Sequence, residues 1–212
     1  MKGLILKDLY ALKGMGKQYV IVILFMLLWA IGMKTPSFVY VFSIMMGAMV
    51  ILSSLTLDEA ISFNRFALTM PVNVNTLIKA KYVLFLITMG LGVGVSCILM
   101  FIMQLLPVQM EGFDYLEMVP VMTIFIVGTS IALPVIFQKG AEKGRYAYIA
   151  SMLGMGAVFY GILKLCTACG ISLEEMAAMN EEMFAVVSVG ICIVSLLISY
   201  QVSVKLVRKK EW

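Results

Sequence analysis

Long uncharged, apolar runs alternate with short charged segments along the whole chain. A bilayer core of about 30 Å is crossed by roughly 20 helical residues, because each residue rises about 1.5 Å. Six runs reach or approach this length: 19–33, 38–57, 82–106, 119–137, 146–168 and 183–204. The pattern therefore predicts an all-α polytopic membrane protein with six transmembrane helices.

Two of these runs depart from the simple pattern. The first is short, but the aliphatic stems of Lys17 and Lys34 can extend it toward the headgroups. The fifth contains Lys164, close enough to its end for the ammonium group to reach the membrane surface. A cleavable signal peptide is the alternative for the first run. We prefer a true span, because bulky residues such as Trp29 occupy the place where a small-residue cleavage site would lie.

The distribution of basic residues predicts the orientation. All of the 16 Lys and Arg residues except Lys34 and Lys164 lie at the termini or in the segments after the second and fourth runs. Basic residues in short loops favour the cytoplasmic side, so we expect a multi-pass protein of the cell membrane with both termini in the cytoplasm. The net charge of +4 fits this sorting pattern. We see no basic patch interleaved with aromatic residues, so nucleic acid is not an expected partner.

The chain divides into three predicted regions. Residues 1–18 are expected to form an amphipathic interfacial helix on the cytoplasmic side, with Ile5, Leu9 and Leu12 on one face. Residues 19–205 are expected to form the six-helix transmembrane domain, and residues 206–212 a basic cytoplasmic tail. Glycines in the third and fifth runs are expected to let helix backbones approach closely.

The cysteines and the missing histidine argue against a metal site. Cys166 and Cys169 form a C-x-x-C pair near the outer end of the fifth run. Within an apolar helix, such cysteines are usually small hydrophobic residues that pack against neighbouring helices or lipid. Whether they form a disulfide stays open. With no His and no second thiol pair, the chain lacks the usual zinc ligands.

Several classes of membrane function lack the residues that they need. The six runs contain no Asp, Glu, His or Arg, so coupling to protons or sodium is not expected. Ser and Cys occur in them without a base, so we do not expect an enzyme. The phosphate-loop pattern G-x-x-x-x-G-K-[ST] is absent from the sequence. The chain is therefore expected to be driven by, or to anchor, another protein.

The segment after the second run has its own helical pattern. Phe63, Phe66 and Met70 follow the i, i+3, i+7 spacing of one apolar helix face, and Pro71 would end that helix. Asp58 and Glu59 are expected at its N-terminus, where exposed N–H groups favour acids. The pattern predicts a short amphipathic helix whose apolar face needs a partner, either the inner leaflet, the chain's own bundle or another protein.

Two segments carry a resemblance to a known family. Residues 57–72, followed by Lys79 to Tyr82, resemble the first cytoplasmic loop of the ABC type 2 exporter permeases, in particular the small bacterial ones that begin with a segment like Leu4 to Asp8. Residues 140–145 are similar to the Glu-Lys-Gly-Arg step of the loop after the fourth span in the same group. Small peptide exporters, such as the phenol-soluble modulin exporters, are the most specific resemblance.

This resemblance implies a transmembrane permease subunit that pairs into a homodimer or heterodimer and couples to two copies of a separate ATPase subunit. ATP and magnesium would bind that partner, and the chain itself would hold no cofactor. The expected cargo is an amphipathic peptide, either a toxin or an antimicrobial peptide, or another hydrophobic molecule. The predicted ATPase contacts are Asp58, Glu59, Phe63, Asn64, Arg65, Phe66, Met70 and Pro71, with Glu142, Lys143 and Arg145 after the fourth run. The alternative is a scaffold or sensor subunit that binds a cytoplasmic partner without transporting anything.

Overall fold

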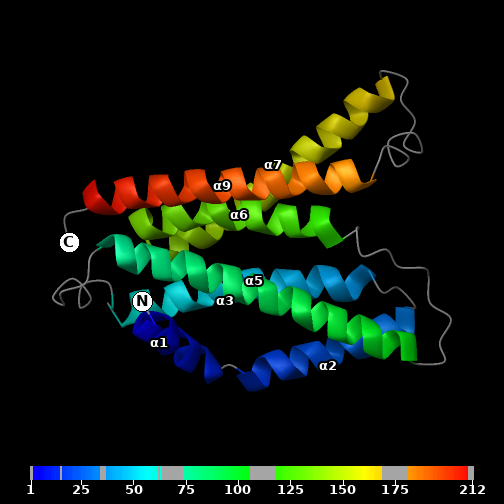
Figure 1. Ribbon diagram of the computed structural model, residues 1–212, viewed down its shortest axis with the longest axis horizontal. Helices are drawn as coiled ribbons and strands as arrows, with labels where there is room; N and C mark the ends of the chain where they lie inside the picture. The colour runs from blue at the N-terminus through cyan, green and yellow to red at the C-terminus, as the bar shows by residue number, and fades with distance from the viewer. Residues whose placement is uncertain are drawn as a thin grey trace. The chain divides into compact units, whose positions relative to one another are not determined.

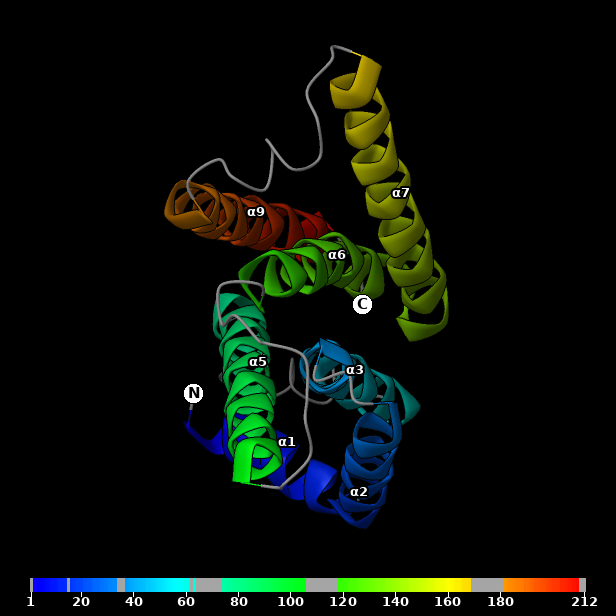
Figure 2. The same ribbon diagram turned by 90° about the vertical axis from the view of Figure 1, so that its right-hand side faces the viewer.

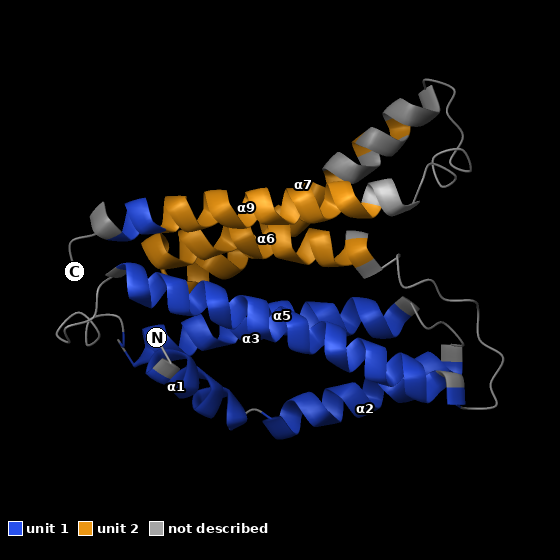
Figure 3. Cartoon of the chain, viewed as in Figure 1, with its two compact units in different colours: residues 1–114, 204–212 blue, residues 115–203 orange. Residues whose placement is uncertain are grey.

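The computed structural model describes residues 2–14, 16–33, 37–61, 63, 74–105, 118–168 and 181–209. Every element in these ranges is a helix, which confirms the all-α prediction for this part of the chain. The helices are α1 (Lys2–Lys13), α2 (Gly16–Met33), α3 (Ser37–Ala60), α5 (Val74–Leu105), α6 (Met118–Lys139), α7 (Ala141–Ala168) and α9 (Glu181–Lys209) (Figure 1). They form two units, residues 1–114 with 204–212 and residues 115–203, which we describe separately (Figure 3).

Within the described residues, four helices are long and apolar enough to cross a membrane: Phe38–Ala60, Asn75–Met103, Val121–Lys139 and Ala185–Val207. They correspond to the second, third, fourth and sixth predicted spans. Gly3–Lys13 and Gly16–Gly32 meet at a 63° bend and qualify only when taken together as one broken span. The structure thus supports a polytopic membrane protein, and the count of six spans stays a prediction.

In the first unit, α3 and α5 lie side by side (Figure 2), and their backbones come close together at two glycines. A Cβ atom added to Gly47 would lie 2.7 Å from the carbonyl oxygen of Thr88. One added to Gly92 would lie 2.8 Å from the carbonyl oxygen of Ser43. The predicted close approach at glycines of the third span is confirmed at Gly92, whereas a Cβ at Gly90 would meet nothing within 4 Å. Gly47 is the matching small residue on α3.

The short helices α1 and α2 pack against this pair. At one end, Ala30 of α2 forms a buried cluster with Val39 of α3 and with Leu99 and Met103 of α5. At the other end, α1 contacts α3 and α5. These contacts bring the N-terminal helix to the end of α3 and the beginning of α5.

The predicted apolar face of α1 divides between two environments. Leu12 is buried, whereas Leu9 is 39% exposed. The inward face includes the carboxylate of Asp8. The helix over this segment is therefore confirmed, but its inward face combines apolar and charged residues. The position of α1 at a membrane interface stays a prediction.

In the second unit, a single residue connects α6 and α7. Gly140 has φ 93°, a backbone conformation that favours glycine. Its N–H donates to the carbonyl oxygen of Ile136 at 2.9 Å, and its own carbonyl oxygen accepts the N–H of Gly144 at 3.1 Å. We expected a loop over 140–145, but α7 begins at Ala141, because the conformation of Gly140 alone turns the chain.

Side-chain hydrogen bonds link α9 to α6. The hydroxyl of Ser199 donates to the carbonyl oxygen of Ser130 at 2.5 Å, and the thiol of Cys192 lies 3.5 Å from the hydroxyl of Thr123. Only 17% of the apolar window of α9 is buried, the lowest share among the four candidate spans. Most of the surface of α9 is therefore available to lipid or to other chains.

Candidate functional site

Four charged side chains meet where α1, α3 and α5 come together. Lys81, near the start of α5, places Nζ 2.8 Å from Oδ2 of Asp8 and 2.5 Å from Oδ2 of Asp58. Lys7 places Nζ 2.5 Å from Oδ1 of Asp58 and 3.2 Å from Oδ1 of Asp8. Each carboxylate thus lies between two ammonium groups and each ammonium group between two carboxylates. We call Lys7, Asp8, Asp58 and Lys81 the charge ring; its formal charge is zero.

The ring is buried on one side and partly open on the other. Asp8, Asp58 and Lys81 are at most 3% exposed. Inside, Nζ of Lys81 donates to the hydroxyl of Ser54 at 3.0 Å, while its contact with Asp58 is an ion pair without hydrogen-bond geometry. A buried charge is tolerated only when it is paired and its remaining hydrogen-bonding capacity is largely used. The reciprocal pairing in the ring meets this condition.

Lys7 lies on the more open side of the ring. Its side chain is 31% exposed, and its Nζ lies 3.4 Å from the centroid of the Phe63 ring. An ammonium group over an aromatic face is attracted by the negative potential of the ring. Lys7 therefore connects the two carboxylates of the charge ring to the first part of the segment that follows α3.

The structure corrects the predicted environment of two acids. We expected Asp58 and Glu59 at the N-terminus of a helix, but α3 continues to Ala60, so both lie in its last turn. The N–H of Ile61 donates to the carbonyl oxygen of Leu57 at 3.2 Å and closes this turn. Carboxylates are unfavourable near the negative end of a helix dipole. At Asp58 this is offset by the two lysines of the charge ring.

The residues predicted to contact an ATPase in the first segment have different environments. Asp58 is buried in the charge ring, so its carboxylate is turned toward Lys7 and Lys81 and away from the surface. Glu59 is exposed at the end of α3, and Phe63 lies against Lys7. The others in this segment, Asn64, Arg65, Phe66, Met70 and Pro71, lie outside the described residues.

The residues predicted in the second segment lie together at the start of one helix. Glu142, Lys143 and Arg145 belong to the first two turns of α7 and are all exposed. Glu142 lies in the first turn, where the helix dipole favours an acid. The connection through Gly140 fixes this turn directly against the end of α6. The second unit thus carries a compact, charged helix start on its surface.

Sequence reasoning missed the partners of Asp58. The sequence does contain one signal for such partners, which is that acids and lysines occur together near the membrane ends. Lys7, Asp8, Asp58 and Lys81 all lie close to the ends of apolar runs or within α1. Charges that enter a poorly hydrated region need counter-charges nearby. Their pairing could not be read from spacing, because Lys81 and Asp8 are 73 residues apart.

A comparison with known families decides the general identity of the chain. The sequence pattern of the family described as "ABC-2 family transporter protein" matches residues 3–208. The chain belongs to the ABC-2 transporter family. No curated protein and no solved structure is significantly similar to the chain.

Membership of the ABC-2 family accounts for the apolar helices and for the absence of an ATP-binding motif. Permeases of this kind are transmembrane subunits of ABC transporters. The matched range includes every residue of the charge ring and the exposed start of α7. The predicted resemblance to ABC type 2 permeases is confirmed, and the narrower resemblance to peptide exporters stays a prediction.

Proposed function

We propose that the chain is the permease subunit of an ATP-driven exporter. In this proposal it forms a dimer and binds two copies of a separate cytoplasmic ATPase, which holds ATP and magnesium. The observation that carries the proposal is the ABC-2 family match over residues 3–208, nearly the whole chain. The apolar helices give it a membrane location, and the absence of a phosphate loop from the sequence makes an external source of energy necessary.

Two surfaces are proposed to receive the ATPase. The first is the segment from Glu59 to Pro71, which begins beside the charge ring. The second is the start of α7, where Glu142, Lys143 and Arg145 are exposed on a rigid helix. Both belong to segments that the basic-residue bias assigns to the cytoplasm. A helix start that is held by a tight turn moves together with its helix. It is therefore suited to transmit a movement of the ATPase to the membrane helices.

The proposed cargo is an amphipathic peptide or another hydrophobic molecule that leaves the cell. The resemblance to small peptide exporters supports this choice. The 19 Met residues also supply flexible apolar surface that adapts to varied ligands. A scaffold or sensor subunit is the alternative and would bind a cytoplasmic partner without moving a cargo.

The proposal is tested by purifying the chain with its partner. An ATPase that contains a phosphate loop is expected to copurify, and its hydrolysis in liposomes should rise when an amphipathic peptide is added. Mass measurement in nanodiscs should give two permease chains with two ATPase chains. A partner that binds while peptides never change hydrolysis or cross the bilayer would support the scaffold alternative instead.

The proposed contact is tested by charge reversal at Arg65. Arg65→Glu is expected to weaken ATPase binding about tenfold, equivalent to roughly 1.4 kcal/mol, because it replaces a directional donor with an acid. Lys164→Glu is the matched control, since the same charge change falls at the opposite predicted membrane face. Equal binding and export by both variants would remove the first surface and leave the start of α7 as the proposed contact.

A further inference from the structure

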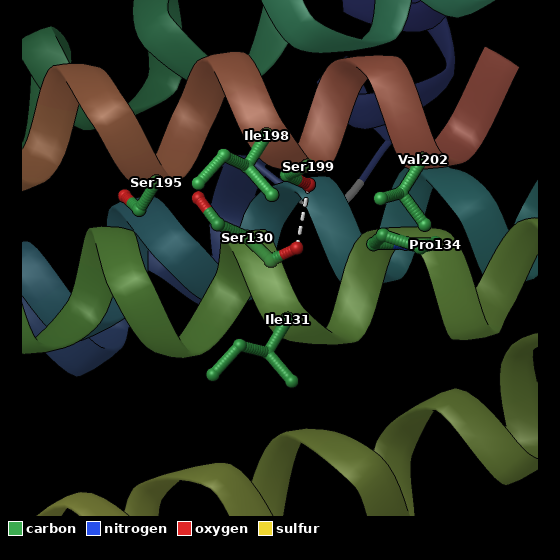
Figure 4. Close-up of a pocket in the computed structure, with 7 residues that line it drawn as sticks. All are labelled: Ser130, Ile131, Pro134, Ser195, Ile198, Ser199 and Val202. Atoms are coloured by element: carbon green, nitrogen blue, oxygen red, sulfur yellow. Dashed lines mark hydrogen bonds between the residues drawn. The ribbon is translucent and has the colours of Figure 1, made fainter.

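A pocket of about 310 Å³ lies between α6 and α9 within the second unit. Ser130, Ile131 and Pro134 line it from α6, and Ser195, Ile198 and Ser199 line it from α9 (Figure 4). Apart from these hydroxyls, the described residues that line it are aliphatic, and none of them is charged. Its volume is at the lower end of the range for small-molecule sites.

Pro134 explains why a side-chain hydrogen bond joins α6 and α9 beside this pocket. Proline has no N–H, so the carbonyl oxygen of Ser130, four residues earlier, loses its usual donor within the helix. The hydroxyl of Ser199 donates to that carbonyl oxygen across the helix pair at 2.5 Å (Figure 4). A backbone acceptor inside an apolar region is thereby satisfied by a side chain of the neighbouring helix.

The hydroxyl of Ser130 is the unused polar group. The hydroxyl of Ser199 donates to the carbonyl oxygen of Ser130, and the hydroxyl of Ser195 donates to the carbonyl oxygen of Cys192 at 2.9 Å. The Ser130 side chain is 3% exposed, and its Oγ has no partner among the described residues. Figure 4 shows this hydroxyl extending from α6 toward α9. A buried hydroxyl without a partner is unfavourable, so this site favours a molecule that can supply one.

We propose that this pocket binds a neutral aliphatic molecule that carries one hydroxyl group and enters from the bilayer. A ligand hydroxyl can accept the proton of Ser130 or donate to its oxygen, since the Ser130 hydroxyl is both a donor and an acceptor and has no partner among the described residues. A charged ligand is disfavoured, because no counter-charge lines the pocket.

The bilayer is the proposed source because of where the pocket lies. Ile131 and Ile198 at its edge are 49% and 58% exposed. The pocket lies near the middle of both apolar segments, Val121–Lys139 and Ala185–Val207. Lipid-soluble molecules can therefore reach it without crossing a polar surface. This inference is independent of export and of the ATPase.

The experiment uses the full chain in phosphatidylcholine nanodiscs and a hexadecanol that carries a photoreactive diazirine. We expect saturable labelling of peptides from α6 and α9. Unlabelled hexadecanol should compete, and hexadecane should compete at least several-fold less well. Ser130→Ala should weaken the apparent affinity roughly two- to tenfold, the range for the loss of one hydrogen bond. Ser188→Ala, a buried serine of α9 outside the pocket, is the matched control.

Two results would overturn the inference. Equal competition by hexadecanol and hexadecane would mean that the pocket binds any aliphatic chain, with or without a hydroxyl group. Unchanged affinity in Ser130→Ala would mean that its hydroxyl serves the helix backbone instead, as serines in helices often do. Ile198→Phe keeps Ser130 and narrows the opening, so it should also reduce labelling. Normal labelling of this variant would contradict the location even if Ser130→Ala failed to fold.

Discussion

Replacing Lys81 with methionine tests whether the charge ring holds α1, α3 and α5 together. Lys81→Met keeps an unbranched aliphatic side chain and removes one ammonium group. The ring would then contain Asp8, Asp58 and Lys7, with a net charge of −1. The Oδ2 atoms of both acids, and the hydroxyl of Ser54, would lose their common partner in a region that is almost inaccessible to solvent.

The expected magnitude depends on which side of the ring is opened. Removing one partner of a buried pair costs about 3 to 5 kcal/mol, because an uncompensated charge remains. Lys7→Met changes the net charge equally, but the Lys7 side chain is 31% exposed, so water can replace its ammonium group. We expect a cost of roughly 1 to 2 kcal/mol there, including the contact with Phe63. Lys81→Met should therefore be the more destabilising variant.

Neutralising the remaining charge provides a second comparison. The double variant Asp58→Asn, Lys81→Met leaves Lys7 and Asp8, so the ring returns to zero net charge. Its cost should fall short of the sum of the two single costs by about 1 to 3 kcal/mol, the usual range for residues in one network.

These free energies can be measured by reversible unfolding of the purified chain. Circular dichroism in mixed micelles of increasing denaturing detergent would follow the loss of helix, provided that each variant shows one transition. Equal costs for Lys7→Met and Lys81→Met would refute the reasoning from burial. Additive costs in the double variant would show that Asp58 and Lys81 do not interact as the distances indicate.

Three other predictions follow from the backbone and the charge distribution. Gly47→Ala should force α3 and α5 apart and cost about 1 to 3 kcal/mol in the same assay, whereas Gly90→Ala, with open space around its Cβ, should change stability by less than about 0.5 kcal/mol. Gly140→Ala places a side chain at φ 93° and should cost roughly 1 to 3 kcal/mol; wild-type stability would argue against the turn between α6 and α7. In cells, a single cysteine at Gly112 should react with an impermeant thiol reagent and one at Asn73 should not, with all native cysteines replaced; the reverse labelling would reject the predicted topology.

The helices were predictable because a long run of uncharged, apolar residues is a strong signal for a membrane-spanning helix. The apolar runs at 38–57 and 119–137 lie almost entirely within α3 and α6. The helix boundaries were less predictable where a charged side chain is buried inside the protein. α5 begins at Val74, well before the expected start at Tyr82, because Lys81 is buried by its partners and need not end the helix. Asp58 is also buried by its charged partners, so α3 continues through it and no new helix begins there.

The candidate sites were only partly predictable. The family resemblance singled out Glu142 and Lys143, and the structure places both on the surface, while their role as an ATPase contact stays a prediction. The pairing of Asp58 with Lys7 could not be predicted, because the two residues are 51 positions apart and meet only through the packing of α1 on α3. The pocket beside Ser130 was equally hidden, since it depends on which serine of α9 faces Pro134.

The charge ring also changes how the N-terminal helix should be understood. An amphipathic helix on a membrane surface would keep Asp8 in water, where its charge needs no protein partner. In the structure Asp8 is buried, and its charge is balanced by Lys81 of α5, 2.8 Å away, and by its neighbour Lys7, 3.2 Å away. The dependence is mutual, since withdrawing α1 would remove Lys7 and Asp8 together and leave Lys81 and Asp58 with only one of their three ion pairs. Release of α1 would therefore be opposed by electrostatics as well as by lost apolar contacts. We infer that α1 acts as an integral part of the α3–α5 bundle.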